Sequence, residues 1–155
     1  MNYCKITYIL LISFLSFYQP LIGQKKSSDY NFTSIEDGFT QRAITSIFKD
    51  ADGYLWISTY GDGLFRYNGL DFKNYKQERN AKENSLNSSI VYSALQDVQK
   101  NIWVGSELGL NFYNKNNDKF ENITLQEEGQ KLIFSTHTIA EYDENTLLLG
   151  TYEFG

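Results

Sequence analysis

The only histidine of the chain, His137, is the first residue to consider for catalysis or metal binding. It lies in the segment Ser135-Thr136-His137-Thr138, which places no carboxylate, cysteine or second histidine next to it. A general base or a metal site needs such convergent partners. The single cysteine, Cys4, excludes a cysteine-based zinc site. The sequence therefore predicts no catalytic residue, no metal ligand and no cofactor-binding residue in this chain.

Two acidic, glycine-containing segments have the composition of ligand-binding loops but not their spacing. For Asp50-Ala51-Asp52-Gly53 to be an EF-hand calcium loop, its twelfth position would have to be glutamate, where the chain has Gly61. The Asp boxes of sialidases place the aspartate two residues before the glycine, whereas Asp50 lies three residues before Gly53. The segment Gly61-Asp62-Gly63 lacks the third glycine of a dinucleotide-binding loop. Both segments are therefore expected to form β-turns.

The overall composition indicates a folded chain whose partners are not polyanions. Its 155 residues are 41% hydrophobic and 21% charged, which suits one globular domain and not a disordered chain. The formal net charge of −5 argues against binding to nucleic acid or to an anionic membrane surface. Tyrosines at strand ends or turns could stack on sugar rings, although packing between sheets is the competing interpretation. The candidates for such a ligand-binding rim are Tyr60, Tyr67, Tyr113 and Tyr152.

Residues 1–23 have the layout of a secretory signal peptide. Lys5 provides a positive charge, residues 6–18 form an uncharged apolar stretch, and Pro20 precedes the small residue Gly23. The apolar stretch is short for a membrane-spanning helix. An uncleaved N-terminal anchor is the alternative, and both interpretations predict that the rest of the chain lies outside the cytoplasm. The absence of cysteine after residue 23 suits an oxidising compartment.

The remaining residues contain an internal repeat. Residues 46–59 align with residues 93–106 at an offset of 47, so that serine, aspartate and tryptophan coincide. After a one-residue gap, residues 63–68 align with residues 109–114. Residues 147–151 then match residues 102–106 at a further offset of 45, with Leu148 in place of tryptophan. Two copies and part of a third therefore follow the first segment.

Each copy has the pattern of four short β-strands. In the first copy we expect strands at 43–48, 54–59, 64–67 and 72–75, separated by turns rich in glycine, aspartate and asparagine. No helical periodicity appears after residue 23. The predicted organisation is a signal peptide at 1–23, a lead-in segment at 24–42, a first repeat with its linker at 43–89, a second at 90–138 and a truncated third at 139–155.

Four strands in about 45 residues, with one tryptophan in each unit, are typical of a β-propeller blade. A lone four-stranded sheet cannot bury both of its faces, so blades stack side by side. Trp56 and Trp103 are expected to wedge between neighbouring sheets. A closed ring needs about four to eight blades, whereas residues 43–155 supply about two and a half. We therefore expect an all-β partial propeller that forms the first part of a longer protein.

These motifs resemble the two-component regulator propeller repeat. The pattern of that repeat is a strand, Asp-x-x-Gly, tryptophan between apolar residues, Gly-Thr, and then Gly-Leu before a Tyr-Asp-like end. Residues 47–69 follow it in the first copy and residues 97–113 in the second, with Ser58 and Lys100 in place of glycine. The structural repeat positions that the resemblance assigns are Asp50, Gly53, Trp56, Gly63, Leu64, Asp97, Trp103, Gly105, Gly109, Leu110 and Gly150.

The resemblance implies a periplasmic seven-bladed propeller at the start of a sensor of a Bacteroidetes-type two-component system. In such proteins a membrane helix and a histidine kinase or a DNA-binding output domain follow the propellers, so no enzyme activity is expected in this chain. The implied function is reception of a small carbohydrate by a protein that is homodimeric in its full-length form. Its contact with the membrane would be limited to the signal segment or a later helix. Two alternatives stay open: a standalone exported binding propeller, and a propeller glycosidase or lyase.

Overall fold

The computed structural model describes residues 43–78 and 85–152, which all belong to one compact unit of the chain, residues 36–155. Every regular element in these residues is a β-strand, so the predicted all-β class is confirmed. The predicted signal peptide at 1–23 and lead-in segment at 24–42 lie outside the described residues. Within the part of the chain that is described, no helix is long and apolar enough to cross a bilayer.

The first sheet is an antiparallel meander in which each strand pairs with the next one in the sequence. Its second turn requires glycine at Gly63, which has a φ of 81°. A β-carbon at Gly63 would also overlap the backbone oxygen of Tyr75 on the last strand. The strands of this sheet are β1 (Ile44–Lys49), β2 (Leu55–Thr59), β3 (Leu64–Tyr67) and β4 (Phe72–Tyr75).

The second sheet repeats this topology, including the turn in which lysine replaces glycine. Lys100 adopts a φ of 66°, and its amide donates to the carbonyl of Asp97 at 2.9 Å. In the first sheet the amide of Gly53 donates to the carbonyl of Asp50 at 3.1 Å. The departure from glycine therefore leaves the turn unchanged. The strands are β5 (Val91–Gln96), β6 (Ile102–Ser106), β7 (Gly109–Asn114) and β8 (Lys119–Ile123).

A third sheet begins with a long antiparallel pair. Its two strands, β11 (Thr136–Asp143) and β12 (Thr146–Thr151), pair in the same register as the first two strands of the other sheets. A small hairpin, β9 (Gln126–Glu127) and β10 (Gln130–Lys131), lies in the connection from β8.

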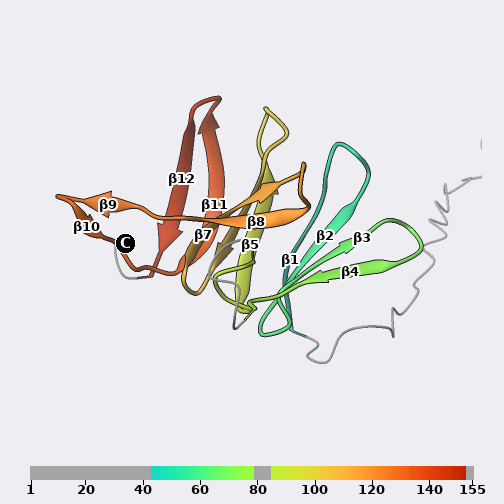
Figure 1. Ribbon diagram of the computed structural model, residues 1–155. Helices are drawn as coiled ribbons and strands as arrows, with labels where there is room; N and C mark the ends of the chain where they lie inside the picture. Colours follow the sequence, from blue (N-terminus) through green and yellow to red (C-terminus); the bar gives the residue numbers. More distant parts are fainter. Residues whose placement is uncertain (1–42, 79–84, 153–155) are drawn as a thin grey trace, which may run out of the picture. The chain divides into compact units, whose positions relative to one another are not determined.

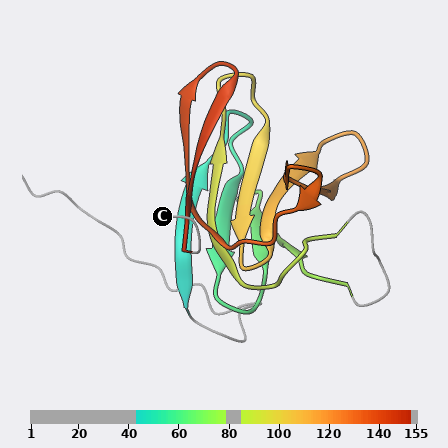
Figure 2. The same ribbon diagram turned by 90° about the vertical axis from the view of Figure 1, so that its left-hand side faces the viewer.

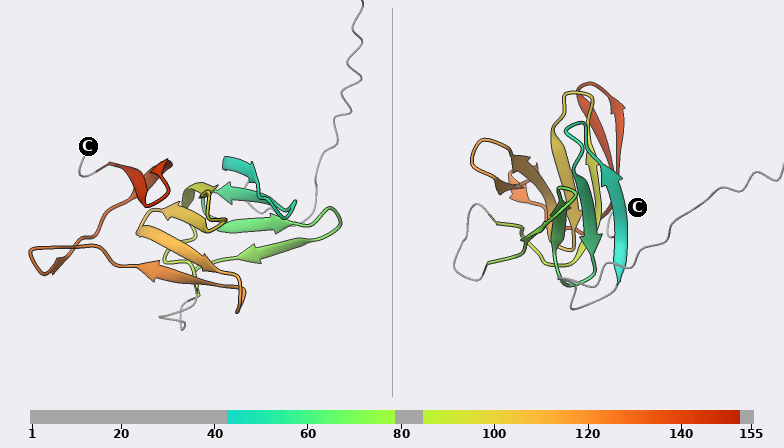
Figure 3. Two further views of the ribbon diagram at one scale, coloured as in Figure 1. Left: turned by 90° about the horizontal axis from the view of Figure 1, so that it is seen from above. Right: turned by 90° about the vertical axis from the view of Figure 1, so that its right-hand side faces the viewer.

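The three sheets follow one another side by side, with their first strands as neighbours (Figure 1). Strand β5 packs against β1 and β2 on one side and against β11 on the other. The views in Figure 2 and Figure 3 show the same order of sheets. Thr45 in β1 donates its hydroxyl to the carbonyl of Val91 in β5 at 2.7 Å. This arrangement is that of neighbouring propeller blades.

The core between the first two sheets is built on Trp56, which is 1% exposed. Its indole stacks on Tyr75 of its own sheet, with ring centroids 5.8 Å apart. It also meets Tyr113 and Phe120 of the second sheet edge-on, at 5.0 and 6.5 Å. The hydrophobic side chains that form this core come from both sheets, so neither sheet encloses the core alone.

Candidate functional site: an aromatic row across the three sheets

The aspartate and tryptophan of each full repeat are joined by a hydrogen bond. The indole Nε1 of Trp56 donates to Asp50 Oδ2 at 2.7 Å, and that of Trp103 donates to Asp97 Oδ2 at 2.8 Å. The other carboxylate oxygen of Asp50 accepts the amide of Tyr54 at 2.9 Å, which fixes the turn. With the spacing Asp-x5-Trp, the two oxygens of one carboxylate can therefore accept hydrogen bonds from the turn backbone and from the indole. The hydrogen bonds lower the pKa of Asp97 although burial alone would raise it.

The third repeat has lost both members of this pair. The residues at the corresponding positions are Tyr142 and Leu148, 45 residues after Asp97 and Trp103. Both side chains are exposed. The turn is instead held by Asp143, whose carboxylate accepts the amide of Asn145 at 2.9 Å. Joint loss of the acceptor and the donor avoids leaving either of them unpaired.

The remaining repeat positions are packing positions. Leu64 and Leu110 are buried where the third strands begin, and Gly109 has a φ of 116°. A β-carbon at Gly105 would lie 2.6 Å from the carbonyl oxygen of Thr136 in the next sheet. The corresponding positions in the other sheets are Ser58, whose hydroxyl accepts from Ser46 at 2.9 Å, and Gly150, which packs against Thr138. None of these residues offers a group to a ligand.

A charged cluster joins the first two sheets around Asp118, in the turn between β7 and β8. Asp118 accepts hydrogen bonds from the hydroxyls of Tyr75 and Tyr113 at 2.6 and 2.5 Å. Lys73 also donates to it, and Arg66 lies 3.2 Å away. Burial alone would raise the pKa of Asp118, but the hydrogen bonds from Lys73 and the two tyrosines, with the charge of Arg66, lower it to about 2.

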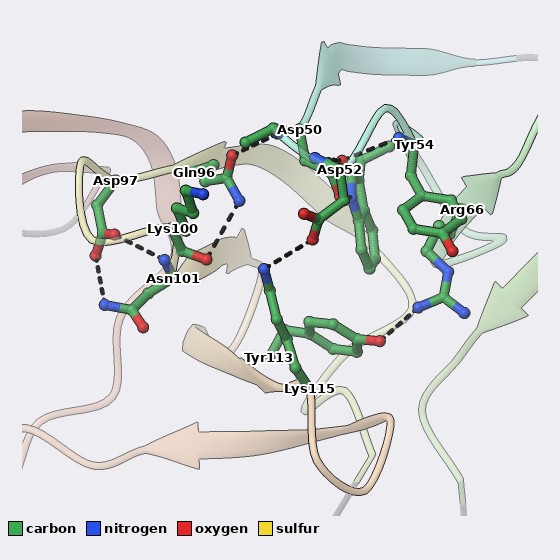
Figure 4. A network of polar contacts seen from close by, with 12 residues as sticks. Asp50, Asp52, Tyr54, Arg66, Gln96, Asp97, Lys100, Asn101, Tyr113 and Lys115 are labelled. Atoms are coloured by element: carbon green, nitrogen blue, oxygen red, sulfur yellow. Dashed lines mark hydrogen bonds and ion pairs between the residues drawn. The ribbon is translucent and has the colours of Figure 1, made fainter.

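Arg66 of this cluster sits among the rings that line the interface between the first two sheets. Its guanidinium carbon lies 4.9 Å from the ring centroid of Tyr54 and 5.6 Å from that of Trp56. It also donates to the Tyr113 hydroxyl at 2.5 Å, as Figure 4 shows. The same figure shows Lys115 of the second sheet reaching Asp52 of the first, with a distance of 3.1 Å. These contacts hold the first two blades together, and Arg66 covers the rings of Tyr54 and Trp56, so these rings are not open to a ligand.

The four tyrosines expected at a rim lie at two opposite ends of the sheets. Tyr67 pairs with Leu55 at the start of β2, and its hydroxyl donates to the carbonyl of Gly69. Tyr113 lies at the same end, is 4% exposed and belongs to the Asp118 cluster. Tyr60 and Tyr152 follow the ends of β2 and β12, and they are 48% and 84% exposed. The structure therefore does not bring the four tyrosines together.

Tyr60 and Tyr152 instead belong to a row of four rings that crosses all three sheets. Tyr60 lies 6.2 Å from Tyr92, and Tyr92 stacks on His137 at 4.0 Å with an interplanar angle of 15°. His137 lies 6.3 Å from Tyr152. We call Tyr60, Tyr92, His137 and Tyr152 the aromatic row. Its members come from β5, β11 and the residues that follow β2 and β12.

Two members of the aromatic row project from β-bulges. In each first strand the register shifts by one residue, so that Thr45, Tyr92 and His137 are extra residues outside the ladder. Bulges redirect a side chain and are frequent beside functional sites. Tyr92 was missed as a site candidate from the sequence, and His137 was considered there only for catalysis or metal binding. The repeat offsets of 47 and 45 from Thr45 were the signal that could have found them, because they place all three at one blade position.

The described residues also enclose two hollows away from the row's rings. A hollow of about 540 Å³ lies between the β9–β10 hairpin and β12, lined by Leu125, Leu132, Phe134 and Leu149 among others. A more polar hollow of about 210 Å³ lies between the second and third sheets, beside Asp97, Trp103 and Glu141. Within residues 43–78 and 85–152, no three histidine, cysteine or acidic side chains are grouped closely enough to hold a metal ion.

Comparisons with known proteins agree with this architecture. Residues 38–61 and 85–107 match the family described as two component regulator propeller. Histidine kinase P4 of Formosa agariphila is 31% identical over 110 residues, which are 64% of this chain and 8% of that protein. The chain thus spans a small part of the length of this curated relative.

Two solved structures from B. thetaiotaomicron show the same fold. One is the extracellular domain of a one-component system, BT4673, with a TM-score of 0.63 and 22% identity, over 78% of this chain and 16% of that one. The other is the extracellular domain of a hybrid two-component system, BT3049, with a TM-score of 0.62 and 22% identity, over 82% and 17% of the two chains. The repeats and their Asp–Trp pairs agree with the match of residues 38–61 and 85–107 to the two-component regulator propeller family.

Proposed function

We propose that this chain is part of the extracytoplasmic, ligand-sensing propeller of a two-component sensor, and that its ligand is an oligosaccharide. In this proposal the chain binds the ligand and carries out no covalent chemistry. Any kinase or DNA-binding output belongs to other parts of the protein. The proposal is supported by the repeat family, by the relative named as a histidine kinase and by the solved extracellular domains with the same fold.

The observation that carries the choice of ligand is the aromatic row. Its two end tyrosines are exposed, and its four rings follow one another across three sheets. Aromatic faces suit sugar rings, which combine flat apolar patches with polar edges. A receptor of this kind would pass the repacking of its blades on binding to a membrane helix.

The test compares the native bacterium with a strain in which the gene for this protein is disrupted. Both strains are given oligosaccharides released from several polysaccharides, and their transcripts are measured. We expect at least one digest to induce a set of genes only when the gene is intact. If disruption changes the response to none of the digests but changes the response to a ligand of another class, the oligosaccharide assignment is wrong. If no transcript depends on the gene, the sensor assignment is wrong as well.

A further inference from the structure

The aromatic row presents open ring surface at its two ends. Tyr92 and His137 stack on each other, so one face of each ring is covered by the other. Tyr60 and Tyr152 lie beyond this pair on either side and are both exposed. A ligand that follows the row therefore meets a tyrosine at each end and the polar groups of a tyrosine and a histidine in the middle.

The repetition of the row suits a chain of similar units. Tyr60 and Tyr152 occupy one blade position, and Tyr92 and His137 occupy another, because they are separated by the repeat offsets. Each position carries a ring in two of the three sheets, with Thr45 and Glu107 at the remaining two places, so that every sheet contributes at least one ring to the row, as an extended oligosaccharide would require. A monosaccharide would contact only part of the row, so affinity is expected to rise with chain length as more rings are engaged.

The charge beside the row is negative. The strand ends that carry it, at 43–47, 58–62, 90–94, 105–109, 135–139 and 149–152, contain no lysine or arginine. Glu107 is exposed there, and its amide donates to the carbonyl of Ile90 at 3.0 Å. Tyr60 forms a backbone bridge with the same Ile90, so Glu107 and Tyr60 lie on either side of one residue at this end of the sheets. The other acidic residue of these segments, Asp62, is buried and lies 3.4 Å from Lys76.

A carboxylate in this place separates two classes of sugar. Glu107 can accept hydrogen bonds from the hydroxyls of a neutral sugar, whereas it repels the carboxylate or sulfate of an acidic one. One of its oxygens already accepts the hydroxyl of Ser88 at 3.1 Å, which holds the side chain in place. We infer that the aromatic row binds a neutral sugar chain laid across the three sheets and discriminates against acidic sugars. The inference rests on the proposed function and adds the location and charge class of the ligand.

The experiment measures binding to the complete protein by isothermal titration calorimetry. The neutral probes are oligosaccharides released from xylan, mannan and laminarin, and the acidic probes are those released from pectin and alginate. We expect at least one neutral probe to bind. Tyr60→Ala and Tyr152→Ala should each weaken that binding about tenfold, the usual loss when one aromatic contact is removed. The matched control is Tyr142→Ala, which removes a tyrosine of β11 that is 73% exposed and outside the row, and it should leave the affinity unchanged.

A second variant tests the charge argument without removing a ring. Glu107→Gln keeps the shape of the side chain and removes its charge, so binding of acidic probes should become measurable or at least tenfold tighter. Neutral binding that is unaffected by Tyr60→Ala and Tyr152→Ala would overturn the location and leave the proposed function standing. Binding of acidic probes alone by the unaltered protein would overturn the charge class. Binding of no probe would overturn the inference together with the oligosaccharide assignment.

Discussion

Removing the carboxylate of Asp50 is expected to loosen the first sheet strongly. Asp50 accepts the indole N–H of Trp56 at 2.7 Å and the backbone amide of Tyr54 at 2.9 Å. Trp56 is buried, so in Asp50→Ala its N–H loses a charged acceptor in a place that water does not reach. The cost of that unsatisfied donor and the lost bond is about 3 kcal/mol. Local opening of the sheet should become about a hundredfold more frequent, since about 1.4 kcal/mol corresponds to a factor of ten.

The same change in the second sheet is expected to cost less and provides the internal comparison. Asp97 makes the corresponding bond to Trp103 at 2.8 Å. Trp103 is only half-buried and lines the polar hollow between the second and third sheets. Water can therefore replace Asp97 as the acceptor, and Asp97→Ala should cost about 1 kcal/mol, or about fivefold in local opening.

Native-state hydrogen exchange of the amides of β2 and β6 in the complete protein measures both effects, because it reports local opening. A third comparison uses Trp56→Phe, which removes the donor. In that background Asp50→Ala should cost less than half of what it costs alone. Equal acceleration of exchange in the two sheets would refute the burial argument. An undiminished cost in the Trp56→Phe background would refute the role of the indole.

Three further predictions concern the contacts between and within the sheets. The pKa of Asp118 is lowered to about 2 from an ordinary 3.8, so the stabilisation by its carboxylate is present above pH 3.8 and is lost as the pH falls through 2. The free energy of unfolding of Asp118→Asn, measured against pH, should lack this pH-dependent contribution. The same pH dependence in the variant and the unaltered protein would contradict the prediction. Gly105→Ala should destabilise the contact with the third sheet by about 1–3 kcal/mol in urea unfolding, because its β-carbon would lie 2.6 Å from the Thr136 carbonyl oxygen; a neutral result would show that the sheets can separate slightly. The double change Tyr142→Asp with Leu148→Trp should slow hydrogen exchange in β11 and β12, because it restores the hydrogen bond between indole and carboxylate. The control Leu148→Trp alone should not slow it. Equal effects of the double and the single change would show that no such hydrogen bond forms.

The strands could be predicted from the sequence because each is specified by neighbouring residues. Turn residues mark the ends of each strand, and aspartate with tryptophan six positions later recurs in both full copies. The sequence does not show that this spacing serves a hydrogen bond between the two side chains, because that bond depends on the indole pointing toward the turn that carries the aspartate. The same holds for Lys100, which looks like a poor substitute for glycine but adopts the left-handed conformation that the turn needs.

The candidate site was only partly predictable because it is assembled from three sheets. Tyr60 and Tyr152 could be chosen as strand-end tyrosines, and that local signal also selected Tyr67 and Tyr113. The local signal does not distinguish the two pairs, but strand direction does, because Tyr60 follows the second strand and Tyr67 ends the third, antiparallel strand. The burial of Tyr113 also depends on a carboxylate and on partners from another sheet. His137 gains its neighbours only when the second and third sheets meet.

The Asp118 cluster has a consequence for exchanging repeats between proteins of this architecture. Its carboxylate is carried by one repeat, while Arg66, Lys73 and Tyr75 come from the repeat before it. The pairs Tyr67–Phe72 and Tyr113–Phe120 show that the last turn of the second sheet, which carries Asp118, is two residues longer than that of the first sheet. The two copies thus share one sheet topology but differ in the side chains that join each sheet to its neighbour. A chimaera made by transplanting a single repeat would separate the Asp118 carboxylate from Arg66 and Lys73. Adjacent repeats must therefore be moved as a pair. Recombination between natural genes faces the same constraint.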